Sequence, residues 1–455
     1  MSEDNAQNAQ IEQAVKKPEK LGVKNWVIIW VAGLAGQLAW NIENQWFNTF
    51  VYAKIAPDPS IITWMVAVSA IISTFSTFLS GTGSDRAGRR RPFIAVGYVL
   101  WGVFTIVFGL TEFLPNSNIV AAATMVVVAD AVMSFFGSVG NDAGFNPWTT
   151  DITNAGNRGS LGAAISVQPV LATIIGSLGG GFIIQSLGYI WFFVIMGVFV
   201  IGVGIYCAFT IKEGASLKPA VDPKGFWHQF GQAFNFKLLL KNKLLLVVLC
   251  VFAMFFISFN IYFPHILNFF IYTYSYDEGM AGVLLGAGLV AAIPLTILAG
   301  KFINRQKFGA VVSAAVLMNM VGLAVMTLTQ FSSNNRAALT ATIIIATFFV
   351  GGGYMVFYQA LMIWCKNLYP EEQRGQLEGV RLLFYVCVPM VFGPVIANPV
   401  IKAFGQPVTL YYDGVGIGGH SPSVELFYVA LAIAALTFIP LFFAHRLQKK
   451  VEAGE

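Results

Sequence analysis

The residues with the clearest chemical potential are acidic side chains that fall deep inside long apolar segments. Of the 22 acidic residues, only Glu43 and Asp130 do so. Asp130 lies about eleven residues into an apolar run, which at ~1.5 Å per residue places it near the middle of a ~30 Å hydrocarbon core. A lone carboxylate there costs about 2.5–3.5 kcal/mol on insertion scales. We therefore predict cation coupling at Asp130 and Glu43, with a protonated, helix-locking hydrogen bonder as the alternative for Asp130.

A dense group of amides and indoles surrounds Glu43 in the segment 26–52. Its amides recur at helical spacing and form one polar stripe, which a lipid-facing helix could not carry cheaply. Amides and indoles suit the hydroxyl groups and the flat face of a sugar ring. We predict that this stripe lines a solute site, with the candidates Gln37, Trp40, Asn41, Glu43 and Asn44.

Two later apolar segments carry comparable side chains. The segment 244–270 contains Asn260 and His265, and the segment 337–359 contains Tyr354 and Tyr358. Single aromatic residues of this kind are more often packing residues than ligand contacts. We nevertheless predict that these four residues complete the solute site from the second half of the chain.

A cluster of charge stands between two apolar runs, in the loop Gly81–Phe93. It contains Asp85 and the arginines Arg86, Arg89, Arg90 and Arg91. Cationic side chains in a short loop stay on the cytoplasmic side of a membrane, so the loop fixes the orientation of its neighbours. It is either a topological anchor or a gate.

Further charged residues follow the ends of other apolar segments. Glu378 and Arg381 are three residues apart and can pair on one face of a helix, as a gate or as a plain cytoplasmic salt bridge. We predict gating roles for Asp85, Arg86, Arg89, Arg90, Asp142, Asp151, Arg158, Arg374, Glu378 and Arg381.

Composition decides the class of protein. The 455 residues are 56% hydrophobic and only 11% charged, too few charges to cover a soluble domain of this size. The net charge is +5, and the basic residues lie between apolar runs, so membrane topology explains them better than nucleic-acid binding. The four cysteines have no metal or redox spacing, and no phosphate-binding loop or catalytic elbow is present. We predict an integral membrane protein that is not an enzyme and holds no metal or cofactor.

The apolar segments predict an all-α protein with twelve transmembrane helices in two bundles of six. We expect a disordered tail at 1–20, bundles at 21–211 and 244–447, a hinge loop at 212–243 and a second tail at 448–455. The twelve spans are 26–52, 61–83, 93–114, 119–140, 160–184, 189–211, 244–270, 278–300, 309–330, 337–359, 376–403 and 424–445.

The distribution of positive charge predicts the orientation. With the N-terminus inside, only Lys54, Arg336 and Lys402 of the 27 Lys and Arg residues fall on the outer side. Such a bias places both termini in the cytoplasm.

Two anchors repeat in the second half of the chain. Gly300–Arg305 follows Gly81–Arg86 by 219 residues with similar spacing, and Arg374-Gly375 follows Arg158-Gly159 by 216. This predicts a parallel repeat, in which two bundles rock about a central site.

The pattern Gly-x-x-x-Asp-Arg-x-Gly-Arg-Arg in Gly81–Phe93 resembles the loop between helices 2 and 3 of the major facilitator superfamily. Its continuation to Pro92 and Phe93 looks like the glycoside-pentoside-hexuronide:cation symporter branch, which includes melibiose and sucrose carriers. Further resemblances lie in Thr149–Gly159 and Leu368–Gly375. The resemblance implies the major facilitator fold and cation-driven uptake of glycosides by alternating access.

The chain departs from that branch in its second span. Melibiose-type members use paired aspartates there for sodium, whereas this span has hydroxyl residues, including Ser73 and Thr74, and no carboxylate. We therefore favour a proton over Na⁺ as the coupling ion, and an uncoupled facilitator is a further alternative.

Together these observations predict a secondary active transporter that takes up a sugar or glycoside. The alternatives are an exporter or carrier of amphipathic, lipid-like solutes and a non-transporting membrane sensor. We expect a monomer in the plasma membrane, with the bilayer and a small solute as its partners.

Overall fold

The computed structural model describes residues 21–114, 118–153, 157–214, 217–232, 236–369, 374–412 and 415–453. The tail expected at 1–20 lies outside these residues. The described chain is almost entirely helical, which confirms the predicted fold class. The segment 448–453, expected to be a tail, continues the last helix.

Six long helical segments form the first half. They are α2 (Val23–Phe50) with η1 (Val51–Ile55), α3 (Pro59–Ala87), α4 (Arg91–Leu110) with η2 (Thr111–Phe113), α5 (Ile119–Gly137) with η3 (Ser138–Phe145) and α6 (Asn146–Asp151), α7 (Arg158–Leu187) and α8 (Tyr189–Thr210).

The connection between the halves contains two short helices, and six further helical segments follow. The connecting helices are α9 (Phe226–Gln232) and α10 (Phe236–Lys241). The second half contains α11 (Lys243–Tyr262) with η4 (Phe263–His265), α12 (Ile266–Asn268) and η5 (Phe269–Thr273), α13 (Glu278–Ile303), α14 (Phe308–Thr327) with α15 (Thr329–Ser332), α16 (Arg336–Asn367), α17 (Arg374–Leu382) with η7 (Leu383–Cys387) and α18 (Val388–Phe404), and α19 (Glu425–Leu436) with α20 (Phe438–Ala453).

Local sequence signals explain where several of these helices begin and end. Asp58 caps α3 by accepting a hydrogen bond from the Ser60 amide at 2.9 Å, and Pro59 occupies the first helical turn. Asn118, Asn242 and Asp277 cap α5, α11 and α13 in the same way. Gly88 ends α3 with a φ of 59°, the left-handed conformation that glycine adopts most easily.

Within the described residues, eleven helical segments are long and apolar enough to cross a membrane. The twelfth long segment is α2, whose 28 residues would also span a bilayer but include the polar stripe. The fourth predicted span is longer than expected, since α5, η3 and α6 run without a break to Asp151. Asp142 and Asp151 therefore lie within this continuous helical segment.

The two halves pack along two matching interfaces, α3 against α18 and α7 against α13. The first interface joins the second and eleventh long segments, and the second interface joins the fifth and eighth. A parallel repeat of six helices relates the second segment to the eighth and the fifth to the eleventh, so it exchanges the two interfaces. At the second interface, Gly282 of α13 lies against the Ser177 carbonyl oxygen of α7. Small residues of this kind let helix backbones approach closely.

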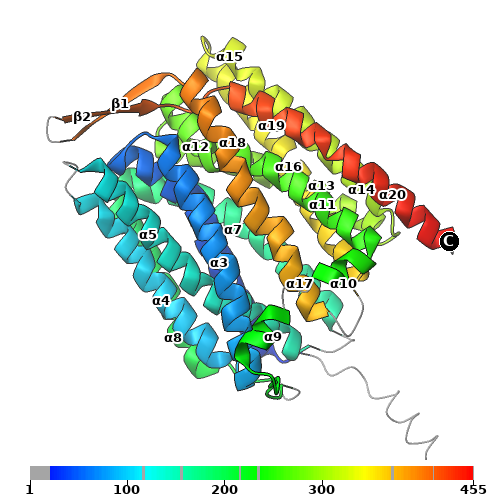
Figure 1. The fold of residues 1–455 in the computed structure, drawn as a ribbon. Helices are drawn as coiled ribbons and strands as arrows, with labels where there is room; N and C mark the ends of the chain where they lie inside the picture. Colours follow the sequence, from blue (N-terminus) through cyan, green and yellow to red (C-terminus); the bar gives the residue numbers. More distant parts are fainter. Residues whose placement is uncertain are drawn as a thin grey trace, which may run out of the picture.

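A β-hairpin that the sequence did not suggest follows α18. Strand β1 (Pro407–Tyr412) pairs antiparallel with β2 (Val415–His420), and Pro407 lies opposite His420. Figure 1 shows the hairpin at one end of the molecule and α9 at the other. We call these two ends the hairpin face and the hinge face.

Candidate functional site: a buried carboxylate pair

The two deep carboxylates share one site. Both are buried, with exposed fractions of 5% for Glu43 and 1% for Asp130. Ser134 donates a hydrogen bond to Glu43 Oε1 at 2.7 Å, and Ser134 lies one turn beyond Asp130 on the same face of α5. Asp130 also lies within electrostatic range of Glu43. The sequence identified both carboxylates, and the packing of α2 against α5 makes them a pair.

Hydroxyl groups surround this pair on the side of α3. Ser69, whose hydroxyl donates to the Val66 carbonyl at 3.2 Å, lies close to Asp130, and Ser73 shares a hydrogen bond of 2.5 Å with Ser138 of η3. The hydroxyl face of the second span, which lacks the branch's aspartates, therefore packs against the segment that carries Asp130. Ser69, Ser134 and Ser138 were not predicted, because hydroxyl residues are common in helix contacts and have no distinctive spacing.

Each carboxylate of the pair has one oxygen without a partner. Among the described residues, no hydrogen-bond donor reaches Glu43 Oε2 or Asp130 Oδ1, although both atoms are buried. Buried polar atoms in proteins nearly always have a partner. The two unpartnered oxygens are therefore able to bind a proton, a cation or a water molecule.

Much of the polar stripe of α2 points toward α7. Asn41 donates to Thr173 Oγ1 at 3.0 Å, and Gln45 accepts from Ser177 at 3.0 Å. Trp46 donates its indole N–H to the Gly176 carbonyl at 2.8 Å. These contacts fix α2 to α7 within the first bundle and leave the Asn41 Oδ1 atom without a partner among the described residues.

The other predicted residues of α2 are partly exposed. Trp40 packs against Trp101 with ring centroids 4.7 Å apart, and Gln37 is half-buried one turn earlier. Asn44 donates to the Trp40 carbonyl of its own helix at 2.7 Å, and among the described residues no donor reaches its side-chain oxygen.

The two predicted tyrosines of the second half form an aromatic wall with two residues that were not predicted. The ring of Tyr354 stacks on the rings of Phe259 and Tyr358, with centroid distances of 4.8 and 6.2 Å. Tyr358 in turn contacts Tyr385 of η7 at 5.6 Å, a residue that the sequence did not single out. We call Phe259, Tyr354, Tyr358 and Tyr385 the aromatic wall. The guanidinium of Arg381 lies 5.4 Å from the Tyr385 ring centroid, at one end of the wall.

Asn260 and His265 lie in the first segment of the second half. Asn260 donates to the Phe256 carbonyl of its own helix at 2.8 Å. His265 is fully buried, and neither of its ring nitrogens has a partner among the described residues. Close by in sequence, Asn268 donates to the Asn48 carbonyl of α2 at 3.1 Å, which joins the two halves.

The predicted loop Gly81–Phe93 is mostly helical, since only residues 88–90 lie outside α3 and α4, and its charged side chains form a network on the hinge face that is centred on Arg90. Arg90 Nη1 lies 2.6 Å from Asp85 Oδ1, and its Nε donates to Asp151 Oδ2 at 3.0 Å. The Glu213 carboxylate accepts from the backbone amides of Arg90 and Arg91 at 2.9 and 3.0 Å. The structure thus brings together three residues that the sequence placed at gates, and it adds Glu213.

The remaining gating candidates take different positions. Arg86 donates to Gln229 Oε1 of α9 at 3.1 Å, while Arg89 is exposed. Asp142 accepts from Asn141 at 2.9 Å and is subject to the charge of Arg381 from the other half. The side chains of Arg158, Arg374 and Glu378 lie outside the described part of the structure.

A set of contacts on the hairpin face, which the sequence did not predict, also joins the two halves. The Tyr52 hydroxyl donates to the His420 carbonyl at 3.1 Å, and the His420 amide donates to the Pro57 carbonyl at 2.9 Å. Lys402 lies 3.6 Å from Asp58. The hairpin thus crosses from the second half to the beginning of α3.

The three cations that departed from the charge bias all have partners. Lys402 pairs with Asp58, and Lys54 lies 2.6 Å from Glu112. Arg336 donates to the Tyr274 and Ser275 carbonyls and lies 3.4 Å from the Tyr276 ring centroid. Their departure from the charge bias is a sequence signal from which contacts on this face could have been inferred, although none was predicted.

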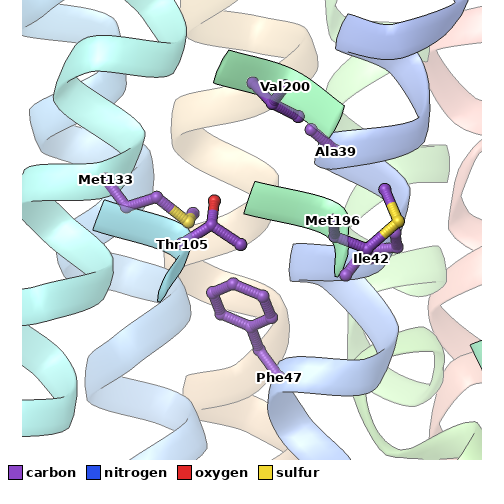
Figure 2. Close-up of a pocket in the computed structure, with 7 residues that line it drawn as sticks. All are labelled: Ala39, Ile42, Phe47, Thr105, Met133, Met196 and Val200. Carbon is purple, nitrogen blue, oxygen red and sulfur yellow. The ribbon is translucent and has the colours of Figure 1, made fainter. Parts of the chain in front are cut away.

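A small cavity inside the first bundle is not a solute site. It lies on the face of α2 that packs against α4, α5 and α8, and it has a volume of about 10 Å³ (Figure 2). Such a space holds at most one water, and an apolar lining of this kind usually stays dry. Its lining residues are Ala39, Ile42, Phe47, Thr105, Met133, Met196 and Val200.

The fold and the site define a multi-pass helical membrane protein, built as two bundles with a buried acidic pair in the first. The sequence profile of the Major Facilitator Superfamily matches residues 26–394, and the chain belongs to this family. Comparison with curated proteins gives no significant match.

Solved structures of two transporters share the fold. A mutant form of the nucleoside transporter NupG aligns with a TM-score of 0.67 at 10% identity, over 92% of this chain and 99% of that one. A D-xylose-proton symporter aligns with a TM-score of 0.66 at 12% identity, over 92% and 97%. At these identities the similarity establishes the architecture and nothing more specific.

Proposed function

We propose that the protein is a secondary active transporter in which Glu43 and Asp130 bind the coupling cation, with a proton favoured over Na⁺. The observation that supports this most directly is the burial of both carboxylates together, each with one oxygen lacking a partner among the described residues. Family membership supports the transporter class, and the buried pair supports coupling.

The physical reason lies in the energy of burying charge. Two anions held close together in a medium of low dielectric constant repel each other, and each also loses its hydration. A proton or a cation bound between them removes both penalties. When water reaches the site from one side, the ion can leave, so occupancy of the pair follows the conformational state of the transporter.

We propose a sugar or glycoside as the solute. The aromatic wall and Trp40 offer flat apolar surfaces for a sugar ring, while Gln37, Asn44 and Glu43 offer polar atoms for its hydroxyls. The names of the structural neighbours, one a nucleoside transporter and one a D-xylose-proton symporter, are compatible with such a solute. The motif in Gly81–Phe93 favours the glycoside–cation branch of the family.

The closed hairpin face suggests the state of the transporter. If the positive charges mark the cytoplasmic side, the hairpin face is external and the contacts of Tyr52, Pro57 and His420 form an outer gate. The network of Asp85, Arg90 and Asp151 then lies on the inner side, where it stiffens the first bundle. We further propose that the protein acts as a monomer in the plasma membrane, with both termini cytoplasmic.

Uptake into proteoliposomes tests the proposal. Radiolabelled pentoses, nucleosides and disaccharides are offered with an imposed proton or sodium gradient. We expect accumulation of one solute class with a proton gradient, loss of accumulation but retained counterflow in Asp130→Asn, and weaker solute binding in Glu43→Gln. Glu112→Gln is a matched control, because Glu112 pairs with Lys54 away from the site. Uphill accumulation by Asp130→Asn would refute coupling at the pair.

The aromatic wall favours a second candidate function, the transport of amphipathic solutes. Phe256 and Phe263 extend the wall around Phe259, with ring centroids 5.8 and 4.3 Å from it, and give this side a strongly apolar character. The same proteoliposomes loaded with a fluorescent lysolipid distinguish the two candidates, since a sugar carrier would neither accumulate nor release it.

A further inference from the structure

The helix α9 lies beside the hinge-face end of α3, on the outside of the molecule (Figure 1). Its Phe230 ring packs against Phe75 of α3 with centroids 5.8 Å apart. Trp227 contacts the rings of Phe226 and Phe230 at 5.3 and 5.8 Å, yet 70% of Trp227 is exposed. A large aromatic side chain is thus held away from the protein rather than packed into it.

The position of Phe75 shows which environment this helix borders. Trp64, Ile71 and Phe75 are 65%, 50% and 43% exposed and recur at intervals of seven and four residues, so they form one stripe on α3. Other faces of α3 pack against α5 and α18. In a transmembrane helix an exposed apolar stripe faces lipid. Phe230 therefore lies at the edge of the lipid region and Trp227 at the membrane surface, where tryptophan is enriched.

The charges around α9 are suited to an anionic surface. Lys218 and Lys224 precede the helix, and Lys224 is exposed. The nearby carboxylate of Asp222 is already engaged, since His228 Nδ1 lies 2.6 Å from it and this hydrogen bond holds the pKa of Asp222 below its usual 3.8. Glu213 is likewise bound to the loop amides. Lys218, Lys224, Arg89 and Arg91 are all exposed, so exposed cations outnumber the two carboxylates Asp222 and Glu213, which keep their negative charge.

The opposite side of α9 is tied to the charged loop. Gln229 accepts from Arg86 at 3.1 Å and donates to the Ala220 carbonyl at 2.9 Å. The Ala220 amide donates to the Asp85 carbonyl at 2.9 Å. Because these hydrogen bonds connect α9 to the segment Gly81–Phe93, a displacement of α9 would also displace that segment.

We propose that α9 is an interfacial anchor that binds anionic headgroups of the hinge-side leaflet, and that lipid composition acts through it on the charged loop. Trp227 enters the headgroup region, and Lys218 and Lys224 attract the lipid charge. The inference depends on the membrane topology of the fold and not on which solute is carried.

Spin-label accessibility tests the anchor directly. The full-length protein, with Cys250 and Cys387 replaced by alanine, is labelled at Trp227→Cys in nanodiscs of phosphatidylcholine with or without phosphatidylglycerol. We expect the label to collide readily with oxygen and poorly with a water-soluble nickel complex. A label at Val221→Cys, an exposed residue six positions earlier with no part in the proposed contact, should collide with nickel. Gly231→Cys, one turn after Trp227 and exposed, repeats the measurement without removing the tryptophan.

The lipid dependence tests the chemistry of the partner. Phosphatidylglycerol should move the labels at 227 and 231 deeper into the bilayer, seen as lower nickel accessibility. The double variant Lys218→Gln, Lys224→Gln should remove this effect. Equal nickel accessibility at 227, 231 and 221 would overturn the anchor and leave the Trp227 surface to a soluble partner. Equal depth with and without phosphatidylglycerol would overturn the role of anionic headgroups.

Discussion

The hydroxyl of Tyr52 offers a quantitative test of the gate on the hairpin face. Tyr52→Phe removes the hydrogen bond to the His420 carbonyl but keeps the ring, which lies 5.5 Å from the Tyr272 ring centroid across the two halves. A hydrogen bond of this kind contributes about 0.5–1.5 kcal/mol net. Since 1.4 kcal/mol corresponds to a tenfold change in an equilibrium constant, the ratio of open to closed hairpin face should rise roughly 2- to 12-fold.

Double electron–electron resonance measures this ratio. Nitroxide labels at Phe113→Cys and Ser333→Cys, both exposed and in different halves, report the distance across the hairpin face. Tyr274→Phe is the matched control, because its hydroxyl bonds to Thr329 Oγ1 at 2.9 Å within the second half. An unchanged distance distribution in Tyr52→Phe, or an equal change in Tyr274→Phe, would refute the assignment of this contact to a gate.

Three further predictions follow from other parts of the fold. Ser333→Cys should react with an impermeant thiol reagent added outside intact cells and Lys224→Cys should not; labelling of Lys224→Cys in sealed cells would contradict the orientation. Asp85→Asn removes a charge-assisted contact to the buried Arg90, worth about 1 kcal/mol because Asp85 is half exposed, and should slow transport about fivefold with solute binding retained; a native rate would show that the segment Gly81–Phe93 is an anchor only. Gly282→Ala would push a Cβ into the Ser177 carbonyl and should lower the free energy of unfolding by about 1–3 kcal/mol, and with it the unfolding temperature, whereas Gly179→Ala has open space and should not; equal unfolding temperatures would rule out close packing there.

The sequence alone determined the helices and the class of protein. The length of an apolar run and the placement of Lys and Arg are properties of single segments, and the bilayer acts on each segment separately. The same reasoning identified Glu43 and Asp130, because a carboxylate in a hydrocarbon core is costly whatever its neighbours are. It also marked Lys54, Arg336 and Lys402 as exceptions, each of which proved to have a partner.

Contacts between segments could be decided only by the tertiary structure. Helical spacing shows which residues share a face of α2, but it does not show that Asn41 and Gln45 meet α7 while Glu43 meets Ser134, 91 residues away. Likewise, the hairpin was unforeseen because a short two-stranded ribbon depends on what it rests against, here Pro57 of the other half. Which face of a helix meets which neighbour depends on the packing of all twelve segments at once, and no single segment of sequence contains that information.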